Sequence, residues 1–394
     1  MAKKEKNDKQ RLMVVNFSVA EPPTFYESNY NEWVKAGKDD KYFDNLLLYS
    51  NLSSTHKSIL SSKIYQIING EIIFDTKKDE LNINQNFIEK LAGDLEIFGA
   101  YAIEVILSRN KKMVAEINHI PLQYLRYAKT SGLKSPGMFF HKNWKKAKVS
   151  KPTFIPFFDI NSKEPRQILL IKKYWAGSEY NIIPSYYGGF NYIKTDYEIS
   201  KFNLNTIEKG LTPSIIISFN DGKPNPEQAD AINELIKEKF SGSEGEKLLL
   251  LFNDNKDKAA DIKILDGSDT ADMYSNLTKE TSQQILTAHQ LTSPALAGIR
   301  VPGQLGNSTE LLQANELFQK NVIIPDRNLI INGLNLILKI NKNRIEINSQ
   351  QSLISSFSET FIEKITSVNE RRKMLGLTEL NEKEINNLKN NTNE

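Results

Sequence analysis

Residues 317–330, LFQKNVIIPDRNLI, have the apolar spacing of one amphipathic helix, but a proline stands inside it. Apolar residues recur every three to four positions before the proline, and Leu329 continues the same face after Pro325. The residues before the proline are Leu311, Ala314, Phe318 and Val322. A proline within a helix removes a backbone hydrogen bond and clashes with the preceding turn, which costs about 3 kcal/mol. The sequence therefore predicts a helix from about Ser308 to Leu338 that is kinked at Pro325.

Two other long helices are predicted on the N-terminal side of this one, at residues 190–211 and 268–290. Each carries one narrow apolar stripe on an otherwise polar surface, which is typical of a helix that packs along a seam. The stripes are Phe190, Ile193, Tyr197, Ser200, Leu204, Ile207 and Leu211 in the first helix, and Met273, Leu277 and Ile285 in the second. A segment with two prolines and three glycines, residues 291–307, separates the second helix from the kinked one.

A small unit lies between the two striped helices. Strands are predicted at residues 214–219, 247–252 and 261–265, and a helix follows Asn225, a good N-cap with Pro226 at the first helical position. About fifty residues bury too little apolar surface for generous stability, so we expect this unit to lean on neighbours or on copies of itself.

The N-terminal half is predicted to mix helices and strands, after a disordered basic tail at residues 1–11. Helices are expected at residues 54–70 and 86–99, and strands at 100–107, 112–118 and 168–175. Residues 129–167 contain four prolines and a lysine cluster, KNWKKAKVSK (142–151), and are expected to be irregular. The C-terminal residues are predicted to form short amphipathic helices that end in a polar tail.

Composition limits the classes of function. The 394 residues are 39% hydrophobic and 25% charged, with a net charge of +3 and no cysteine. The apolar runs are short compared with a membrane span, and the charged N-terminus has no apolar segment of a secretory signal behind it. Without cysteine there is no disulfide and no thiolate metal site. A nearly neutral chain of this length is not dominated by one large basic nucleic-acid face.

Catalytic motifs are not found. The four histidines, His56, His119, His141 and His289, do not have the spacing of metal ligands, and the carboxylates show no obvious pair. Gly298 and Gly303 have the spacing of a phosphate-binding loop, but Gln304 and Leu305 stand where Lys and Ser/Thr are required. We therefore expect no catalytic residue, no cofactor and no metal, and interpret the protein as a non-enzyme.

The order of these elements resembles the portal proteins of tailed bacteriophages, and four stretches carry the resemblance. They are GDLEIFGAYAIEVI with PLQYLRYAK, the stretch from IPSYYGG to IEKGL, ILTAHQLTSPALAGI with the kinked helix, and SVNERRKMLGL. The family fold implied is α+β. Its parts would be an α/β wing (12–189), stem helices (190–211 and 267–290) around a clip (212–266), the tunnel loop with the kinked wing helix (291–338), and crown-like helices with a tail (339–394).

The resemblance implies a ring, a dodecamer in this family, at one capsid vertex of the virion. Double-stranded DNA would be packaged through it and later ejected. The partners implied are further copies of the chain, the DNA, the terminase large subunit, a head–tail connector and the capsid protein or its scaffold, with no membrane and with assembly in the host cytoplasm. Arg300, Gln304 and Asn307 would lie near DNA in the tunnel loop, and Lys201, Lys209 and Lys279 are candidates along the stem.

Two alternatives remain open at this stage. A gene-transfer-agent portal shares the fold and is not distinguishable by sequence. A monomeric or dimeric enzyme could instead bind a polyanionic substrate on the loop from Lys142 to Lys151, but it would require a pocket with converging carboxylates or histidines.

Overall fold

The computed structural model describes residues 25–75, 81–130, 134–177, 179–208, 215–219, 248–252, 268–299, 308–348, 367–374 and 380. Every structural statement below concerns these residues. Three of the segments singled out by sequence, namely the N-terminal tail (1–11), most of the clip and the loop at 300–307, lie wholly or largely outside them.

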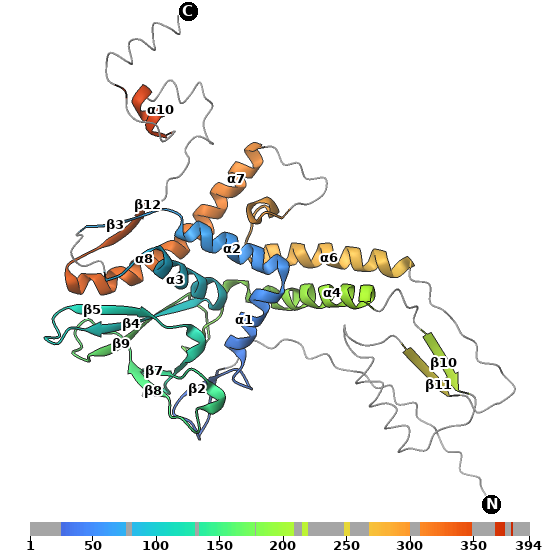
Figure 1. The fold of residues 1–394 in the computed structure, drawn as a ribbon, viewed down its shortest axis with the longest axis horizontal. Coiled ribbons are helices and arrows are strands. Elements are labelled where there is room, and N and C mark those ends of the chain that lie inside the picture. The colour runs from blue at the N-terminus through green and yellow to red at the C-terminus, as the bar shows by residue number, and fades with distance from the viewer. Residues whose placement is uncertain are drawn as a thin grey trace, which may run out of the picture.

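A three-stranded antiparallel sheet forms the centre of the body (Figure 1). Its middle strand β4 (Ala100–Leu107) pairs with β5 (Val114–His119) on one side and β9 (Arg166–Lys172) on the other. The first half of β4 is wholly buried, because α3 (Gln85–Phe98) and α8 (Ile324–Leu338) cover the sheet. The continuous apolar run AYAIEVIL is therefore a strand with both of its faces covered at that end.

Helices α1 (Tyr42–Leu52) and α2 (Ser54–Ile68) pack with α3 beside this sheet. Ser53 caps α2 by accepting a hydrogen bond from the backbone N–H of His56, and Asn84 caps α3 through Phe87. The end of α3 is fixed at Gly99, whose φ is +83° and where a Cβ atom would lie 2.4 Å from the carbonyl oxygen of Ile183. This glycine allows β4 to follow α3 directly.

A second sheet occupies residues predicted to be irregular, so the expectation for residues 129–167 was wrong. It consists of β6 (Leu125–Tyr127), β7 (Gly137–Phe140) and β8 (Thr153–Pro156), which are all antiparallel. A small ribbon, β1 (Phe25–Glu27) with β2 (Val34–Ala36), joins it through a bridge between Trp33 and Ala128. The strands have only three or four residues each, and prolines stand between or at the end of them, so the turn signals concealed the pattern.

Helices α4 (Phe190–Glu208) and α6 (Ser268–Ala288) lie side by side as an antiparallel pair that projects from the body (Figure 1). The chain leaves the body along α4 and returns along α6. A 3₁₀ turn, η3 (Ser185–Gly189), leads into α4. At the far end β10 (Ile215–Phe219) and β11 (Leu248–Phe252) pair in parallel, with Ile215 opposite Leu248. The predicted helix and third strand of this unit lie outside the described residues.

The stripe predicted for the first long helix is only partly right. Phe190 and Ile193 are buried, but Ile199 takes the buried place expected for Ser200, and Leu204 is 54% exposed. The buried face therefore turns away from the predicted one along the helix, and Leu204 presents apolar surface to its surroundings.

The chain returns to the body through η4 (Pro294–Ala297) and the predicted kinked helix. That helix consists of α7 (Ser308–Phe318), one stretch of π-helix named η5 (Gln319–Ile323), and α8. Leu311 is 37% exposed, contrary to the predicted core face, because α7 projects from the body while α8 lies on it (Figure 1).

After α8 and a short turn, η6 (Lys339–Asn341), the chain adds a strand to the body. This strand, β12 (Ile345–Asn348), pairs antiparallel with β3 (Glu71–Phe74). Among the residues that follow and that the structure describes, α10 (Val368–Met374) is helical, as expected for the C-terminal part. The remaining short turns are η1 (Leu122–Tyr124) and η2 (Trp144–Lys146).

Candidate functional site: the base of the paired helices and the kinked helix

The turn η3, which leads into α4, lies closely against the end of α6. A Cβ atom at Gly189 would lie 2.5 Å from the Cβ of Ala288, so the absence of a side chain at Gly189 permits this contact. The body also holds α4 through Asp196, whose carboxylate accepts hydrogen bonds from the hydroxyl groups of Ser53 (2.6 Å) and Thr55 (3.5 Å). The base of the pair is thus fixed to the start of α2.

A buried histidine pair joins the end of α6 to α2. Nδ1 of His56 lies 2.7 Å from Nε2 of His289, and both side chains are almost completely buried. Tyr186 stacks on the His289 ring at 5.0 Å and donates its hydroxyl hydrogen to the carbonyl oxygen of Ile97. The sequence placed these histidines 233 positions apart, so no local spacing could reveal that they meet.

Both imidazoles of this pair are held in the neutral form. Burial and the positive charge of Lys63 lower the pKa of His56 to about 3 and the pKa of His289 well below its ordinary value. A neutral pair can form one N–H···N hydrogen bond, whereas two protonated rings would place two donors face to face. The arrangement suits a structural joint between helices.

Four ionisable side chains converge beneath the kink, on segments far apart in the sequence. We call Lys63, Glu96, Lys173 and Asp326 the buried charge cluster. Lys63 pairs with Glu96, while Nζ of Lys173 lies 3.3 Å from Oε1 of Glu96 and 2.8 Å from Oδ1 of Asp326. The carboxylates of α3 and α8 thus meet through lysines from α2 and from the residue after β9. The sequence shows no obvious carboxylate pair, and this one forms only when distant segments meet in space.

The two carboxyl groups of this cluster differ in their titration. Burial alone would raise the pKa of Glu96, but the ammonium groups of Lys63 and Lys173 hold it below its ordinary value. Burial and the neighbouring Glu96 carboxylate raise the pKa of Asp326 to about 7, although Lys173 opposes that rise. Because Glu96 is closest to both ammonium groups together, it keeps the negative charge, and Asp326 takes the shared proton.

The residue after Asp326 clamps the start of α8 to the end of α2. Nε of Arg327 donates to the carbonyl oxygen of Ile67 at 2.9 Å, and a terminal nitrogen donates to those of Gln66 (2.6 Å) and Asn69 (3.2 Å). These are backbone acceptors that the last turn of a helix leaves without intrahelical partners. Pro325 itself is exposed, so the kinked helix is held by the two residues that follow the proline.

Two irregularities follow one another along the backbone of the kinked helix. The backbone N–H of Ile324 donates to the carbonyl oxygen of Gln319, five residues earlier, which is the π-helical pattern of η5. Pro325 then stands in the first turn of α8, where a missing N–H is tolerated. A π-helical insertion and a proline thus follow one another at the position of the predicted kink, and both are recognised causes of helix kinks.

Of the residues predicted to face DNA, the structure describes Lys201 and Lys279, and it also describes Pro325, the residue predicted to kink the helix. Lys201 on α4 lies 4.0 Å from Glu198 and over the ring of Tyr197, and Lys279 on α6 is exposed. Arg300, Gln304, Asn307 and Lys209 lie outside the described residues, so the structure does not bring them together with any group.

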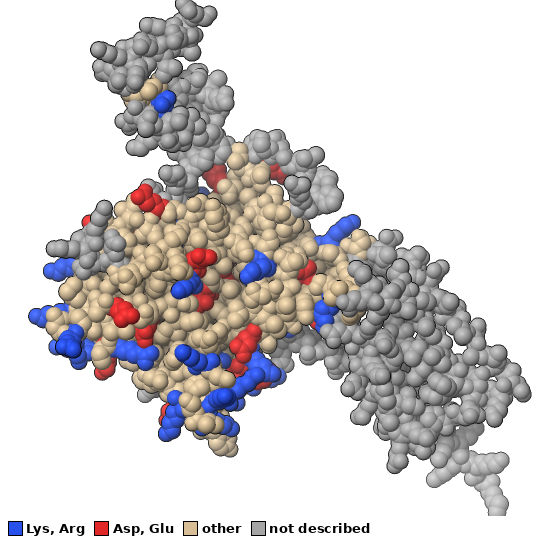
Figure 2. Space-filling view, viewed as in Figure 1, with Lys and Arg blue, Asp and Glu red and all other residues tan. Residues whose placement is uncertain are grey.

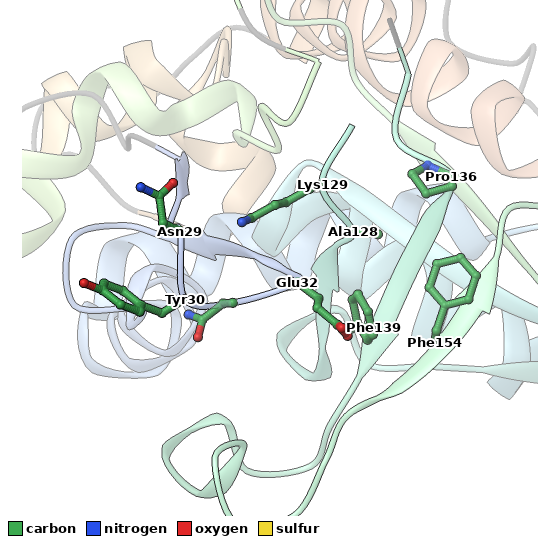
Figure 3. A pocket seen from close by; sticks show the side chains of 9 residues that line it. Asn29, Tyr30, Glu32, Ala128, Lys129, Pro136, Phe139 and Phe154 are labelled. Atoms are coloured by element: carbon green, nitrogen blue, oxygen red, sulfur yellow. The ribbon is translucent and has the colours of Figure 1, made fainter. Parts of the chain in front are cut away.

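The surface hollows do not coincide with the buried clusters. A hollow of about 470 Å³ is lined by residues of the β1–β2 ribbon and the second sheet, with Phe139 and Phe154 side by side on β7 and β8 (Figure 3). A second hollow is lined by Asp75 and residues 335–344. Neither is lined by the buried histidines or by Glu96 and Asp326. The enzyme alternative, which needed such groups in a pocket, gains no support from them.

Within the described part of the chain, no helix has the length and apolar character to cross a membrane. The same residues contain no cluster of three or more His, Asp or Glu side chains placed to hold a metal ion.

Comparison with known structures identifies the fold. A chain of the virion of a native gene transfer agent particle matches at a TM-score of 0.55 and 13% identity, covering 86% of this chain and 94% of that one. A chain of the neck of the native particle, computed with C12 symmetry, matches at 0.53 and 12% over 85% and 94%. An HK97 family phage portal protein from Corynebacterium diphtheriae matches at 0.41 and 8% over 81% and 97%.

The two matches to the gene transfer agent particle carry the assignment, since their TM-scores exceed 0.5. Comparison with protein-family models and with curated protein sequences finds no match. The likeness predicted from the sequence is therefore confirmed at the level of the fold.

Proposed function

We propose that this protein is a portal: a subunit of a ring-shaped channel at one capsid vertex, through which double-stranded DNA is packaged and ejected. The observation that carries the proposal is the shared fold, which extends over 94% of a chain in a gene transfer agent virion. The neck of the related particle was computed with C12 symmetry, which supports a ring of identical copies. The proposed role is structural, not catalytic.

Exposed apolar side chains support assembly with further copies. Leu311, Leu312 and Leu317 on α7 are between 36% and 52% exposed, and Leu204 on α4 is 54% exposed. Both helices project from the body (Figure 1). In a ring, neighbouring subunits would cover these surfaces and supply the burial that a single chain lacks.

In this proposal the channel would be lined from the segments between the paired helices and the kinked helix. Arg300, Gln304 and Asn307 would face DNA in the tunnel loop, with Lys201, Lys209 and Lys279 along the stem. A channel must let DNA slide, and each phosphate neutralised by a lysine or arginine strengthens binding through counterion release. The pairing of Lys201 with Glu198 is consistent with a weakly binding lining, because it offsets one of these charges.

The proposed partners follow from that role. The distal module with β10 and β11 would meet the terminase large subunit during packaging and a head–tail connector afterwards, and the wing would meet the capsid protein or its scaffold. The protein would be found in the virion after assembly in the host cytoplasm. The same fold fits a gene-transfer-agent portal, so the particle to which it belongs is a separate question.

The mass and shape of the purified protein test the proposal. Light scattering gives the number of subunits, and negative-stain electron microscopy shows whether they surround a hole. We expect rings of about a dozen copies, the number that C12 symmetry implies. A compact monomer or dimer that stays so when the capsid protein and scaffold are added would contradict the proposal.

A further inference from the structure

Five lysines stand close together on the connection between β7 and β8, which we call the lysine turn (residues 142–151). They are Lys142, Lys145, Lys146, Lys148 and Lys151, and all five are exposed. Among the described residues, none of them lies within 4.0 Å of a carboxylate oxygen, whereas other exposed charges such as Lys41 and Arg344 have acidic partners. The turn is therefore a concentration of positive charge without local neutralisation.

The backbone of the lysine turn is held in one conformation. The side chain of Asn143 caps η2 by accepting a hydrogen bond from the N–H of Lys145, and the carbonyl oxygen of Lys146 accepts from Val149 and Ser150 at 2.9 Å each. Ala147 is buried beneath the turn. The positions from which the lysine side chains start are thus fixed, so less conformational entropy is lost when they bind a partner.

Aromatic packing ties this turn to the second sheet. The Trp144 ring lies 5.6 Å from the Trp33 ring and 5.8 Å from the His141 ring. The Arg126 guanidinium lies 4.8 Å from the centre of the same Trp144 ring. Arg126 also binds Asp40 at 2.7 Å. Asp40 is therefore paired with Arg126 and not with a lysine of the turn.

The lysine turn and α7 lie on opposite sides of the body (Figure 1). The turn stands at the β2, β7 and β8 end of the body, whereas α7, which follows residues 300–307, projects from the opposite side (Figure 1). Lys and Arg side chains gather over this end in the space-filling view (Figure 2). A partner of this surface would meet the outer part of the subunit.

The composition of the turn favours a nucleic acid over an acidic protein as its partner. Protein interfaces are depleted in lysine and enriched in tyrosine, tryptophan and arginine, whereas the exposed charges here are all lysine. Lysine is a mobile point charge suited to contacts with phosphate that do not depend on sequence. We propose that the lysine turn binds the phosphate backbone of double-stranded DNA outside the channel, as a second DNA contact of the subunit.

The salt dependence of DNA binding tests this proposal with the full-length protein in its own oligomeric state. Anisotropy of a labelled duplex is measured from about 50 to about 200 mM salt, where each phosphate contact contributes about 0.9 to the slope of log affinity against log salt. The variant replaces all five lysines with glutamine (K142Q, K145Q, K146Q, K148Q and K151Q). We expect its slope to be smaller than that of the wild type by about 3 to 4.5, for three to five contacts.

A matched control removes the same charge elsewhere. Lys57, Lys90, Lys112, Lys163 and Lys339 are exposed and dispersed over the body, and their replacement by glutamine (K57Q, K90Q, K112Q, K163Q and K339Q) should change the slope much less. Equal losses in the two variants would show that only net charge matters and would overturn the proposal. Wild-type binding by the lysine-turn variant would also overturn it and would point to an acidic protein partner instead.

Two further measurements on the same samples keep the result interpretable. The variant retains Trp144, Asn143 and Ala147, so its melting temperature should equal that of the wild type. Its subunit number should also be unchanged, because the proposal does not require the turn for assembly. A portal that forms rings but lacks this slope difference would leave the proposed function intact while removing the second DNA contact.

Discussion

At the scale of single residues, the carboxyl group of Asp326 makes a pH-dependent contribution to stability. Its pKa is raised to about 7 by burial and by Glu96, above the ordinary value near 4. The folded state therefore holds a proton that the unfolded state releases between about pH 4 and pH 7. The sign follows: this contribution is fully present below pH 4 and is lost as the pH rises through 7, by at most about 1.4 kcal/mol per pH unit.

The substitution Asp326→Asn isolates this effect, because asparagine resembles the protonated acid and does not titrate. We expect the stability of the variant relative to wild type to increase from pH 5 to pH 8. Urea unfolding at these two pH values measures the difference. A relative stability that is constant or decreases over this range would show that Asp326 is ionised throughout.

The buried histidine pair gives folding stability the opposite dependence on pH. The pKa of His289 is lowered by burial and by Lys63, so the folded state keeps a neutral ring while the unfolded state binds a proton below about pH 6.5. Stability is thus present above that pH and is lost as the pH falls, by up to about 1.4 kcal/mol per pH unit for each imidazole.

In His289→Gln, the side-chain amide can occupy the place of Nε2 opposite His56 without titrating. Stability relative to wild type should increase as the pH falls from 7 to 5, the reverse of the trend for Asp326→Asn. The same urea series provides the measurement, and the two variants serve as controls for each other. Parallel curves for His289→Gln and wild type would mean that His289 has the same pKa in the folded and unfolded states.

At the scale of elements, the close contact between η3 and the end of α6 sets how the paired helices leave the body. Gly189→Ala would place a methyl group 2.5 Å from the Cβ of Ala288, so we expect a loss of about 1 to 3 kcal/mol from overpacking. Chemical denaturation of the single and double variants forms a double-mutant cycle. Ala288→Gly on its own leaves space, and combined with Gly189→Ala it should recover most of the loss; additive losses would show that this contact does not set the spacing.

Two features other than Pro325 hold the kinked helix in place: the hydrogen bonds of Arg327 and the π-helical stretch η5. Pro325→Ala should leave the subunit folded, with a change in stability within about 1 kcal/mol, because Arg327 still binds the end of α2 and η5 keeps its π-helical bonds. We expect Pro325→Ala to impair ring assembly or DNA retention instead. Electron microscopy of the rings measures the first, and the yield of packaged DNA measures the second. Normal rings with full DNA yield would show that neither assembly nor DNA retention depends on the proline.

Elements with long periodic patterns were predictable from sequence, whereas contacts between distant elements were not. The predicted strand at residues 100–107 matches β4, and α2, α3, α4 and α6 were predicted within a few residues. The second sheet was missed because its strands are too short to show alternation among prolines. The histidine pair joins two distant segments and the buried charge cluster joins four, so neither could be found from local spacing.

Only some of the site residues proposed from the resemblance lie in the described part of the structure. The structure describes Lys201, Lys279 and Pro325, but not Arg300, Gln304, Asn307 or Lys209, so the DNA-facing role of the loop stays a prediction. The signal at Pro325 was local, since a proline within a helical pattern has one main structural effect. The π-helical stretch beside it has no comparable sequence signature, because QKNVI is compatible with an ordinary helix.

At the scale of the whole molecule, the exposed leucines of α7 distinguish assembly from folding. Replacing Leu311, Leu312 and Leu317 with serine should leave the melting temperature of the subunit almost unchanged, since these side chains are already partly in water. Rings should dissociate at higher protein concentration than those of the wild type, as measured by sedimentation velocity. Leu336→Ser is a control on α8, where the leucine is 49% exposed. Rings as stable as the wild type would exclude α7 as an interface.

The five residues of η5 have a consequence for the direction in which α7 presents its side chains. A π-helical insertion adds one residue to the helix, and each residue of an α-helix advances the side-chain direction by about 100°. The apolar face of α7 is therefore out of phase with that of α8 when residues are counted along the sequence. Phe318 and Val322 remain against the body while Leu311, Leu312 and Leu317 point elsewhere. A chain shortened by one residue within η5 would continue as a regular α-helix and keep these leucines in nearly the same directions, because four α-helical residues turn the chain about as far as the five of the π-helical turn.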